Sequence, residues 1–357
     1  MDFFRRFNPL PVAVVCFLLC ISLLMIWSTS ADRHGSSPLM VKQLIFAGLG
    51  LFLLLIFLLV DYEFWQRIML QLYIGGMLLL LAVCIMGHTA LGAQRWMSVG
   101  GFTFQPSEFF KLVAIILLAA FLSQYEDEQD PKLLFKCLGY LLPALVLILL
   151  QPDLGTALVI VGIALGMFYL AGVSPWWLAG TVLAGLLAAP FALHDYQKKR
   201  LLIFLNPDMD PQGAGWNITQ SKIAIGSGGL LGKGLRQGSQ TQLNYVPEHS
   251  TDFIFSAIGE ELGFLASLII ILLYFALLYS ILKSADEARD NFGRYLVTGV
   301  FLLFLTHILI NIGMTMGIMP VTGIPLCFMS YGGSALMTDF IALGLVLSVY
   351  QRRKKLF

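Results

Sequence analysis

The chain of 357 residues is 58% hydrophobic and only 12% charged, and its formal net charge is +1. Soluble domains are about 25% charged, so this composition excludes an ordinary soluble protein. The near-neutral charge gives no reason to expect a nucleic-acid partner. The five cysteines lie mostly in apolar runs and show no CxxC or other metal-ligand spacing. They are predicted to be small buried residues and not disulfides or zinc ligands.

Long apolar runs recur along the whole sequence. In hydrocarbon every backbone amide must be satisfied within its own segment, so each run is predicted to be a transmembrane helix. The first run follows Arg5 and Arg6 but is longer than the apolar part of a signal peptide, so we interpret it as an uncleaved span. The predicted spans are 9–27, 41–60, 68–86, 107–124, 136–150, 155–172, 175–193, 262–282, 295–317 and 335–351.

Lys and Arg residues gather in alternate short loops, which are the cytoplasmic loops by the positive-inside rule. This distribution puts both termini in the cytoplasm and places the one long connection, residues 194–261, on the opposite side. The predicted fold class is therefore all-α: a polytopic membrane protein with about ten transmembrane helices. Residues 1–357 are predicted to form a single integral membrane domain, with a large extracytoplasmic loop between spans seven and eight.

A carboxylate and an ammonium group stand at the outer end of the fourth predicted span. Pro106 and Ser107 mark a helix start, after which Glu108 and Lys111 share one helix face. Charges at this depth are costly unless they are paired or hydrated. Two interpretations stay open. The pair forms a charged wall of a cavity that receives an anionic headgroup, which we favour, or it is an ion pair that satisfies only itself.

Three further segments contain polar or irregular sequence. Asp153 is interpreted first as the N-cap of the helix that follows it. Residues 226–234 are rich in glycine but lack the residues of a Walker A phosphate loop at two positions. Residues 317–334 contain so many Gly and Pro residues that irregular backbone is expected at the membrane edge, which is tolerated only where protein buries it or a cavity adjoins it.

A second carboxylate lies just before span eight. Ser250 or Thr251 is predicted to cap the helix that begins there, and a stripe of small and polar residues is predicted to line a wetted groove along it. Asp252 at the mouth of such a groove could act as a general base, or it could only stabilise the helix N-terminus through the helix dipole. These two readings stay open. The stripe consists of Asp252, Ser256, Gly259 and Gly263.

Five ordered segments resemble the SEDS family of bacterial cell-wall polymerases (shape, elongation, division, sporulation), and the similarity extends over essentially the whole chain. The elongation branch, which is RodA-like, is matched better than the division branch. Two departures from the family pattern are Cys327, where Pro is expected, and Ser250. The segments are FQPSEFFKL (104–112), QPDLGTAL (151–158), DPQGAGWNITQSKIAIGSGGLLGKG (210–234), PEHSTDFIFSAIGEELG (247–263) and GIMPVTGIPLCFMSYGGSA (317–335).

The resemblance implies an inverting peptidoglycan glycosyltransferase of the bacterial inner membrane. It would polymerise lipid II into glycan strands during cell elongation and shape maintenance, and release undecaprenyl diphosphate. It implies stimulation by a divalent cation, Mg or Mn, and no organic cofactor. The implied partners are lipid II, the glycan linked to undecaprenyl diphosphate, a class B penicillin-binding protein as transpeptidase, and other membrane proteins of the elongation complex.

The resemblance also assigns residues. Asp252 is the implied catalytic residue, interpreted as the general base, and Glu108 and Lys111 match the paired charges of a central cavity. A leaving diphosphate needs cationic groups near it. From charge and location alone, the candidate diphosphate contacts are Arg95, Arg200 and Lys222.

Two other functions remain as alternatives. A lipid II flippase would use functional charges at mid-membrane and would not need Asp252. A structural scaffold for the elongation machinery would leave the Asp252 groove without a role. The amount of polar sequence in the outer loop favours polymerisation over transport.

Overall fold

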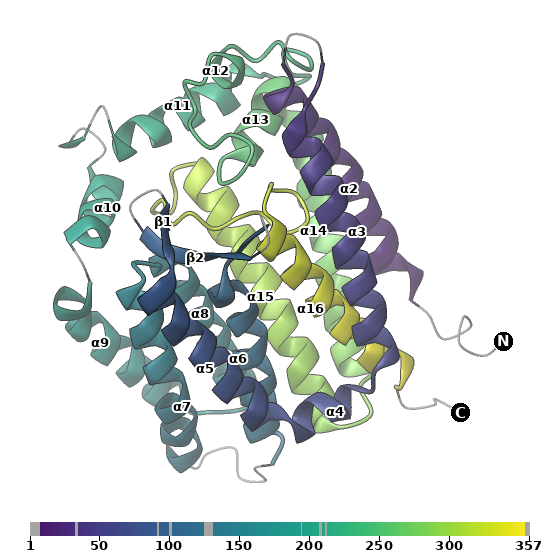
Figure 1. Ribbon diagram of the computed structural model, residues 1–357, viewed down its shortest axis with the longest axis vertical. Coiled ribbons are helices and arrows are strands. Elements are labelled where there is room, and N and C mark those ends of the chain that lie inside the picture. The colour runs from purple at the N-terminus through teal and green to yellow at the C-terminus, as the bar shows by residue number, and fades with distance from the viewer. Residues whose placement is uncertain are drawn as a thin grey trace.

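The computed structural model describes residues 8–32, 35–90, 93–99, 102–124, 131–193, 195–206, 209–210 and 213–353. Each predicted span is a helix in this structure (Figure 1), which confirms the polytopic helical fold. The helices are α2 (Pro9–Ser30), α3 (Pro38–Leu59), α5 (Met69–Met86), α6 (Pro106–Leu122), α7 (Pro131–Leu150), α8 (Leu154–Leu170), α9 (Pro175–Ala192), α14 (Gly263–Asp286), α15 (Asn291–Thr315) and α16 (Gly333–Gln351).

Not all of these helices are equally suited to cross a bilayer alone. Within the described residues, seven are long and apolar enough by length and composition, namely α2, α3, α5, α7, α14, α15 and α16. Helices α8 and α9 are apolar but shorter. Helix α6 has 17 residues, and all but Phe109 and Val113 are buried. A helix so enclosed can carry charged residues, because protein rather than lipid surrounds them.

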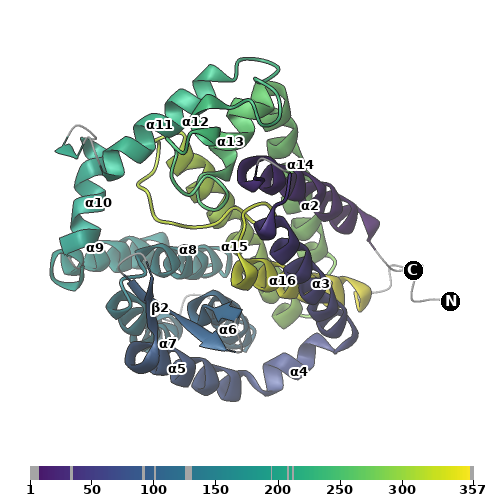
Figure 2. The ribbon, with the colours of Figure 1, turned by 45° about the horizontal axis from the view of Figure 1, so that its top comes forward.

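The centre of the bundle is formed by α6 and α15. Helix α15 packs against α6, α8, α14 and α16, and α6 is enclosed by α5, α7, α8, α15 and α16 (Figure 2). Small residues allow the two central helices to approach closely. A Cβ atom at Gly299 of α15 would lie only 2.4 Å from Cγ2 of Ile115 on α6. Substitution there would push α6 away from α15.

The two ends of the described chain lie on the same side of the bundle. Asn8, before α2, donates from Nδ2 to the Ser280 hydroxyl near the end of α14 at 3.0 Å. Arg352, after α16, donates to the Leu59 carbonyl at the end of α3 at 2.9 Å. Helix α4 (Tyr62–Arg67) follows on this side, where Arg352 also pairs with Asp61 at 3.4 Å. The basic residues Arg5, Arg6, Arg33, Lys354 and Lys355 lie outside the described residues.

We call the opposite side, which carries residues 194–261, the outer side. There the first outer loop forms a small antiparallel sheet of β1 (His88–Ala90), β2 (Ala93–Val99) and β3 (Phe102–Phe104) in the order β1-β2-β3. Val99 pairs with Phe102 and Met97 with Phe104. The sequence did not predict this sheet, since the strands are short and the apolar patterning that identifies spans says nothing about pairing within a loop.

The described part of the long outer connection contains four helices: α10 (Asp195–Leu205), α11 (Ala214–Ser227), α12 (Ser239–Gln242) and α13 (Ile254–Glu261). The predicted wetted groove along α13 is wrong, because α11 fills it. The Ser256 hydroxyl lies 2.6 Å from the Ser221 hydroxyl of α11. A Cβ atom at Gly259 would lie 3.1 Å from Cγ1 of Ile225, and one at Gly228 would lie 1.9 Å from the Gly259 oxygen. The small residues therefore allow close helix packing.

The predicted cap of α13 is also wrong. The helix starts at Ile254, its N-cap is Phe253, and no side chain caps it. The Ser250 hydroxyl instead lies 3.0 Å from the Thr29 hydroxyl of α2. The Thr251 hydroxyl donates to Oε2 of Glu248 at 2.9 Å. These hydroxyl groups therefore stabilise the turn before α13 and do not cap the helix.

Glu260 organises the glycine-rich part of the outer connection. Its fully buried carboxylate accepts a hydrogen bond from Lys233 Nζ at 2.8 Å, from the amides of Gln240 and Thr241 at 2.9 Å each, and from the Thr241 hydroxyl at 2.6 Å. Burial opposes ionisation of Glu260, but these bonds outweigh it and hold the pKa of the carboxyl below its usual value. Lys233 therefore forms an ion pair with Glu260. This agrees with the exclusion of a phosphate loop in residues 226–234.

The cysteine prediction holds only in part. Cys137 and Cys327 are buried and Cys84 is half-buried, but Cys16 and Cys20 are exposed on α2. Exposed apolar side chains such as Phe17 lie beside them. In a membrane helix an exposed face is one that meets lipid, so a small apolar thiol is compatible with that position.

The orientation of the bundle is the first testable prediction. In a background without native cysteines, Gln237→Cys in the exposed outer connection should react with a membrane-impermeant maleimide in right-side-out vesicles. Asp286→Cys at the opposite end of α14 is the matched control and should react only after permeabilisation. The reverse labelling pattern would contradict the assignment of residues 194–261 to the outer side.

Candidate active site

Asp252 lies in the turn that precedes α13 on the outer side of the bundle. Three consecutive backbone carbonyls of this turn each accept a hydrogen bond from a distant part of the chain. The Asp252 backbone is therefore held from several directions, and its carboxylate is carried on a rigid turn. The three bonds run from Tyr331 N to Ser250 O (2.9 Å), from Ser330 Oγ to Thr251 O (2.6 Å) and from Asn311 Nδ2 to Asp252 O (2.9 Å).

The electrostatic surroundings of Asp252 suit a proton acceptor. Burial, followed by the negative charge of Glu248, raises the pKa of Asp252 to about 6, although Arg200 and Arg95 oppose the shift. The side chain is partly exposed. A carboxyl group with this pKa is ionised at neutral pH and still binds a proton more readily than an ordinary aspartate, as general-base catalysis requires.

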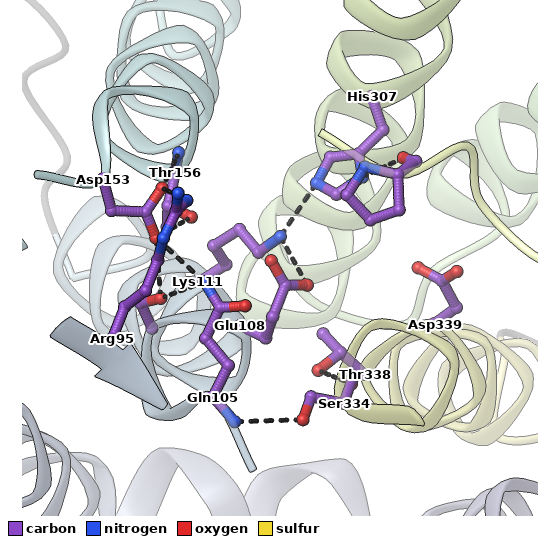
Figure 3. Close-up of polar contacts among 12 residues, drawn as sticks. Arg95, Gln105, Glu108, Lys111, Asp153, Thr156, His307, Ser334, Thr338 and Asp339 are labelled. Carbon is purple, nitrogen blue, oxygen red and sulfur yellow. Dashed lines mark hydrogen bonds and ion pairs between the residues drawn. The ribbon is translucent and has the colours of Figure 1, made fainter. Parts of the chain in front are cut away.

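Arg95 reaches the site from the small sheet. It lies on β2, and its Nη1 is 3.5 Å from Oδ1 of Asp153 (Figure 3). Asp153 accepts from the amide of Thr156 at 3.2 Å, so its predicted role as N-cap of α8 is confirmed. It also accepts from Gln105 Nε2 at 2.9 Å and from the Ser107 hydroxyl at 3.0 Å. Asp153 therefore fixes both Arg95 and the start of α6.

The other two predicted diphosphate contacts come from the long outer connection. Arg200, on α10, donates to the Val321 carbonyl at 3.2 Å and is close enough to lower the pKa of Asp252. Lys222, on α11, is exposed, and a Cβ atom at Gly317 would lie 2.6 Å from its Nζ. Lys222 is not among the charges that shift Asp252. Arg95 and Arg200 are thus close enough to Asp252 for their charges to act on it, whereas Lys222 lies beside Gly317.

The predicted pairing of Glu108 and Lys111 is confirmed, but not their exposure. Lys111 Nζ is 2.9 Å from Glu108 Oε2, and the side chains are 1% and 7% exposed (Figure 3). Lys111 Nζ is also 2.9 Å from Nε2 of His307 on α15. The expected charged wall of an open cavity is therefore a buried network, because α15 supplies a further partner that closes the lysine off.

Sequence reasoning missed three polar residues of the last two spans. His307 contacts Lys111, Asn311 contacts Asp252, and Asp339 on α16 accepts from the Phe328 amide at 3.0 Å. All three are buried. The signal was present for two of them, since an ionisable residue inside a span is a functional candidate by default. Asn311 gave only the weaker signal of an amide in an apolar run.

The residues around Asp252 are compatible with only one kind of divalent-cation site. Among the described residues, no group of three or more His, Cys, Asp or Glu side chains could hold a metal ion. In phosphate chemistry Mg²⁺ is usually held by one or two carboxylates together with the substrate's phosphate oxygens. The exposed carboxylate of Glu248 fits such a shared site and not a dedicated protein cage.

A bundle of apolar helices that carries a rigidly held carboxylate and two guanidinium groups on one side defines a multi-pass membrane protein with a polar reaction site. The chain belongs to the FtsW/RodA/SpoVE family, described as cell cycle proteins, whose family model matches residues 9–355. This confirms the family that the five sequence segments predicted.

Similar proteins include peptidoglycan glycosyltransferase MrdB of Escherichia coli, which is 38% identical over 98% of this chain and 95% of its own length. Peptidoglycan glycosyltransferase RodA of Treponema pallidum is 34% identical over 97% and 98%. Among solved structures, a chain of a peptidoglycan synthase complex that coordinates polymerization and crosslinking is 30% identical, with a TM-score of 0.82 over 97% and 98% of the two chains. The rod shape determining protein RodA of Thermus thermophilus has a TM-score of 0.74 at 27% identity over 98% of each chain.

The pKa of Asp252 predicts a pH dependence. A general base works as the carboxylate, so the polymerisation rate should fall about tenfold per pH unit below pH 6 and level off above pH 7. An ordinary aspartate would place this limb near pH 4. Glu248→Gln removes a charge that raises the pKa and should move the limb to lower pH. A rate that stays constant from pH 7 down to pH 5 would contradict the assignment.

Proposed function

We propose that this chain is a peptidoglycan glycosyltransferase that polymerises lipid II on the outer face of the bacterial inner membrane during cell elongation. Relatives of nearly full-length similarity carry the name peptidoglycan glycosyltransferase. The observation that carries the proposal is Asp252, held rigidly on the outer side with a pKa raised to about 6 and with Arg95 and Arg200 near it. A base and cations in one place are what glycosyl transfer from a diphosphate requires.

In the proposed reaction the 4-hydroxyl of the acceptor GlcNAc attacks the anomeric carbon of the donor. The new C–O bond forms as the bond from that carbon to the diphosphate oxygen breaks, and the configuration inverts. Asp252 accepts the hydroxyl proton and later releases it to solvent. The undecaprenyl diphosphate leaves with both electrons of the broken bond, so its negative charge grows in the transition state and is stabilised by nearby cations.

The basic residues divide into two groups by whether their charge acts on Asp252. Arg200 and Arg95 act on the carboxyl group itself and would meet the diphosphate at the reacting end. Lys222, exposed beside Gly317, would bind farther along the same segment. Guanidinium groups bind phosphate oxygens in a bidentate manner, whereas lysine acts as a point charge. We therefore assign the leaving group to the arginines and a flanking phosphate to Lys222.

Glu108 and Lys111 are a buried pair in the proposed site. The pair joins α6 to α15 through His307. Direct contact of Lys111 with a headgroup would require α6 and α15 to separate, since the side chain is 1% exposed. In this structure Lys111 links the two central helices through its contact with His307.

A divalent cation, Mg or Mn, is retained as a proposal. Glu248 would hold it together with oxygens of the bound diphosphate, and it would supply positive charge for the leaving group. No organic cofactor is invoked. The implied partner is a class B penicillin-binding protein that crosslinks the new strand, within an elongation complex. The similarity to a chain of a peptidoglycan synthase complex supports this.

A lipid II flippase remains as a second candidate because of one observation. Lys111, Glu108, His307 and Asp339 are ionisable groups buried within the helical bundle, where transporters often carry functional charges. Such a protein would need these residues and would not need Asp252. A structural scaffold would need neither group.

The Asp252 side chain provides the test. Asp252→Asn keeps the shape of the side chain but cannot accept a proton usefully, so glycan polymer formed by the purified chain and its transpeptidase from lipid II should fall about 10²- to 10⁴-fold. Asp210→Asn is the matched control, because Asp210 is an outer carboxylate that pairs with the largely exposed Lys199 at 3.1 Å. It should polymerise normally.

Products are read as glycan length on a gel, with expression and transpeptidase binding measured in parallel. Native polymerisation by Asp252→Asn would remove the base assignment and favour the flippase or the scaffold.

A further inference from the structure

Asn311 is a fully buried amide on α15, and its orientation is fixed by its neighbours. Its Nδ2 donates to the carbonyl of Asp252 at 2.9 Å and to that of Ile324 at 2.7 Å. Carbonyl oxygens only accept hydrogen bonds, so Nδ2 and not Oδ1 must face them. Both amide hydrogens are used, and Oδ1 has no partner among the described residues.

The hydrogen bond to the Asp252 carbonyl differs from the hydrogen bonds to the carbonyls of Ser250 and Thr251. Ser250 and Thr251 are held by the 326–331 segment, which is itself irregular. Asp252 alone is held by a side chain of a long, central helix. Its carbonyl is only a few bonds from its carboxylate, so a shift at the carbonyl displaces the proton-accepting oxygen. Gly323 leaves room for that carboxylate, since a Cβ atom there would lie 3.3 Å from Oδ2.

His307 repeats this arrangement one turn earlier on the same face of α15. Its Nδ1 lies 3.2 Å from the Pro325 carbonyl, so Nδ1 carries the hydrogen. Its Nε2 is then an acceptor and receives a hydrogen bond from Lys111. Asn311 and His307 thus bind the consecutive carbonyls of Ile324 and Pro325. Through them α15 connects Asp252 to the Lys111 and Glu108 pair.

We propose that Asn311 is a positioning residue for Asp252, and that α15 sets the place of the carboxylate through this one amide. The proposal rests on the proposed function, because it has meaning only if Asp252 accepts the proton. Asn311 touches no reacting atom. It acts by holding the Asp252 backbone, so its loss should lower kcat and leave KM nearly unchanged.

The test variant is Asn311→Leu, which keeps the branching at Cγ, is larger than asparagine and removes both donors. A displacement of about 1 Å costs about 10²-fold in rate, so kcat for glycan polymerisation by the chain with its transpeptidase should fall between about tenfold and a hundredfold. Thr298→Val on the same helix is the matched control. Among the described residues the Thr298 hydroxyl donates to Arg294 O within α15 alone, and the variant should retain native kcat and KM.

A double-mutant comparison separates positioning from a general structural role. In the Asp252→Asn background the base is already absent, so adding Asn311→Leu should change the residual rate by less than about twofold. An equal loss in both backgrounds, or a native kcat for Asn311→Leu, would overturn the proposal. If Asn311→Leu does not accumulate as folded protein, Asn311→Ser, which is too short to reach both carbonyls, is put through the same comparison and judged by the same outcomes.

The same experiment tests the proposed function and the positioning role of Asn311 separately. Native activity of Asp252→Asn alone would remove the proposed base and with it the proposed function. If the Asp252→Asn variant is inactive and the Asn311→Leu variant has native activity, only the positioning role is removed. The glycosyltransferase assignment then stays intact.

Discussion

The backbone between α15 and α16 is irregular at the edge of an apolar bundle, and hydrocarbon offers no hydrogen-bond partners to such backbone. Side chains of the flanking helices and of the segment itself supply them. Asp339 of α16 accepts from the Phe328 amide at 3.0 Å, the Ser330 hydroxyl accepts from the Leu326 amide at 2.8 Å, and Asn311 donates to Ile324 O at 2.7 Å. The same segment then donates to the turn that carries Asp252. The need to satisfy this backbone is thus what fixes the proposed base.

Two levels of polar groups follow from this arrangement. The outer level holds Asp252, with Arg95 and Arg200 near it, and is partly exposed. The inner level holds Glu108 and Lys111 and is closed to solvent. Because α15 binds both levels, a movement of this helix would change them together. A site preorganised in this way has little reorganisation to undergo when charge develops, which is the main source of electrostatic catalysis.

Local features of the sequence predicted much of this structure. The spans were predictable because hydrophobic length is a property of a single segment, and the pairing of Glu108 with Lys111 followed from a three-residue spacing on one helix. The N-cap at Asp153 was local as well. The wetted groove along α13 was wrong because α11, more than thirty residues away at Ser221 and Ser256, fills it. The contacts of Asn311 and His307 join separate spans, and no local pattern encodes them.

We infer that this chain polymerises lipid II at its outer face and does not transport it. The most direct measurement uses proteoliposomes of uniform orientation that contain the chain and its transpeptidase, with fluorescent lipid II placed only in the leaflet on the side of residues 194–261. Glycan length and the transbilayer movement of lipid II are followed in the same sample. We expect glycan polymer without movement of lipid II between leaflets. Movement of lipid II without polymer would contradict it.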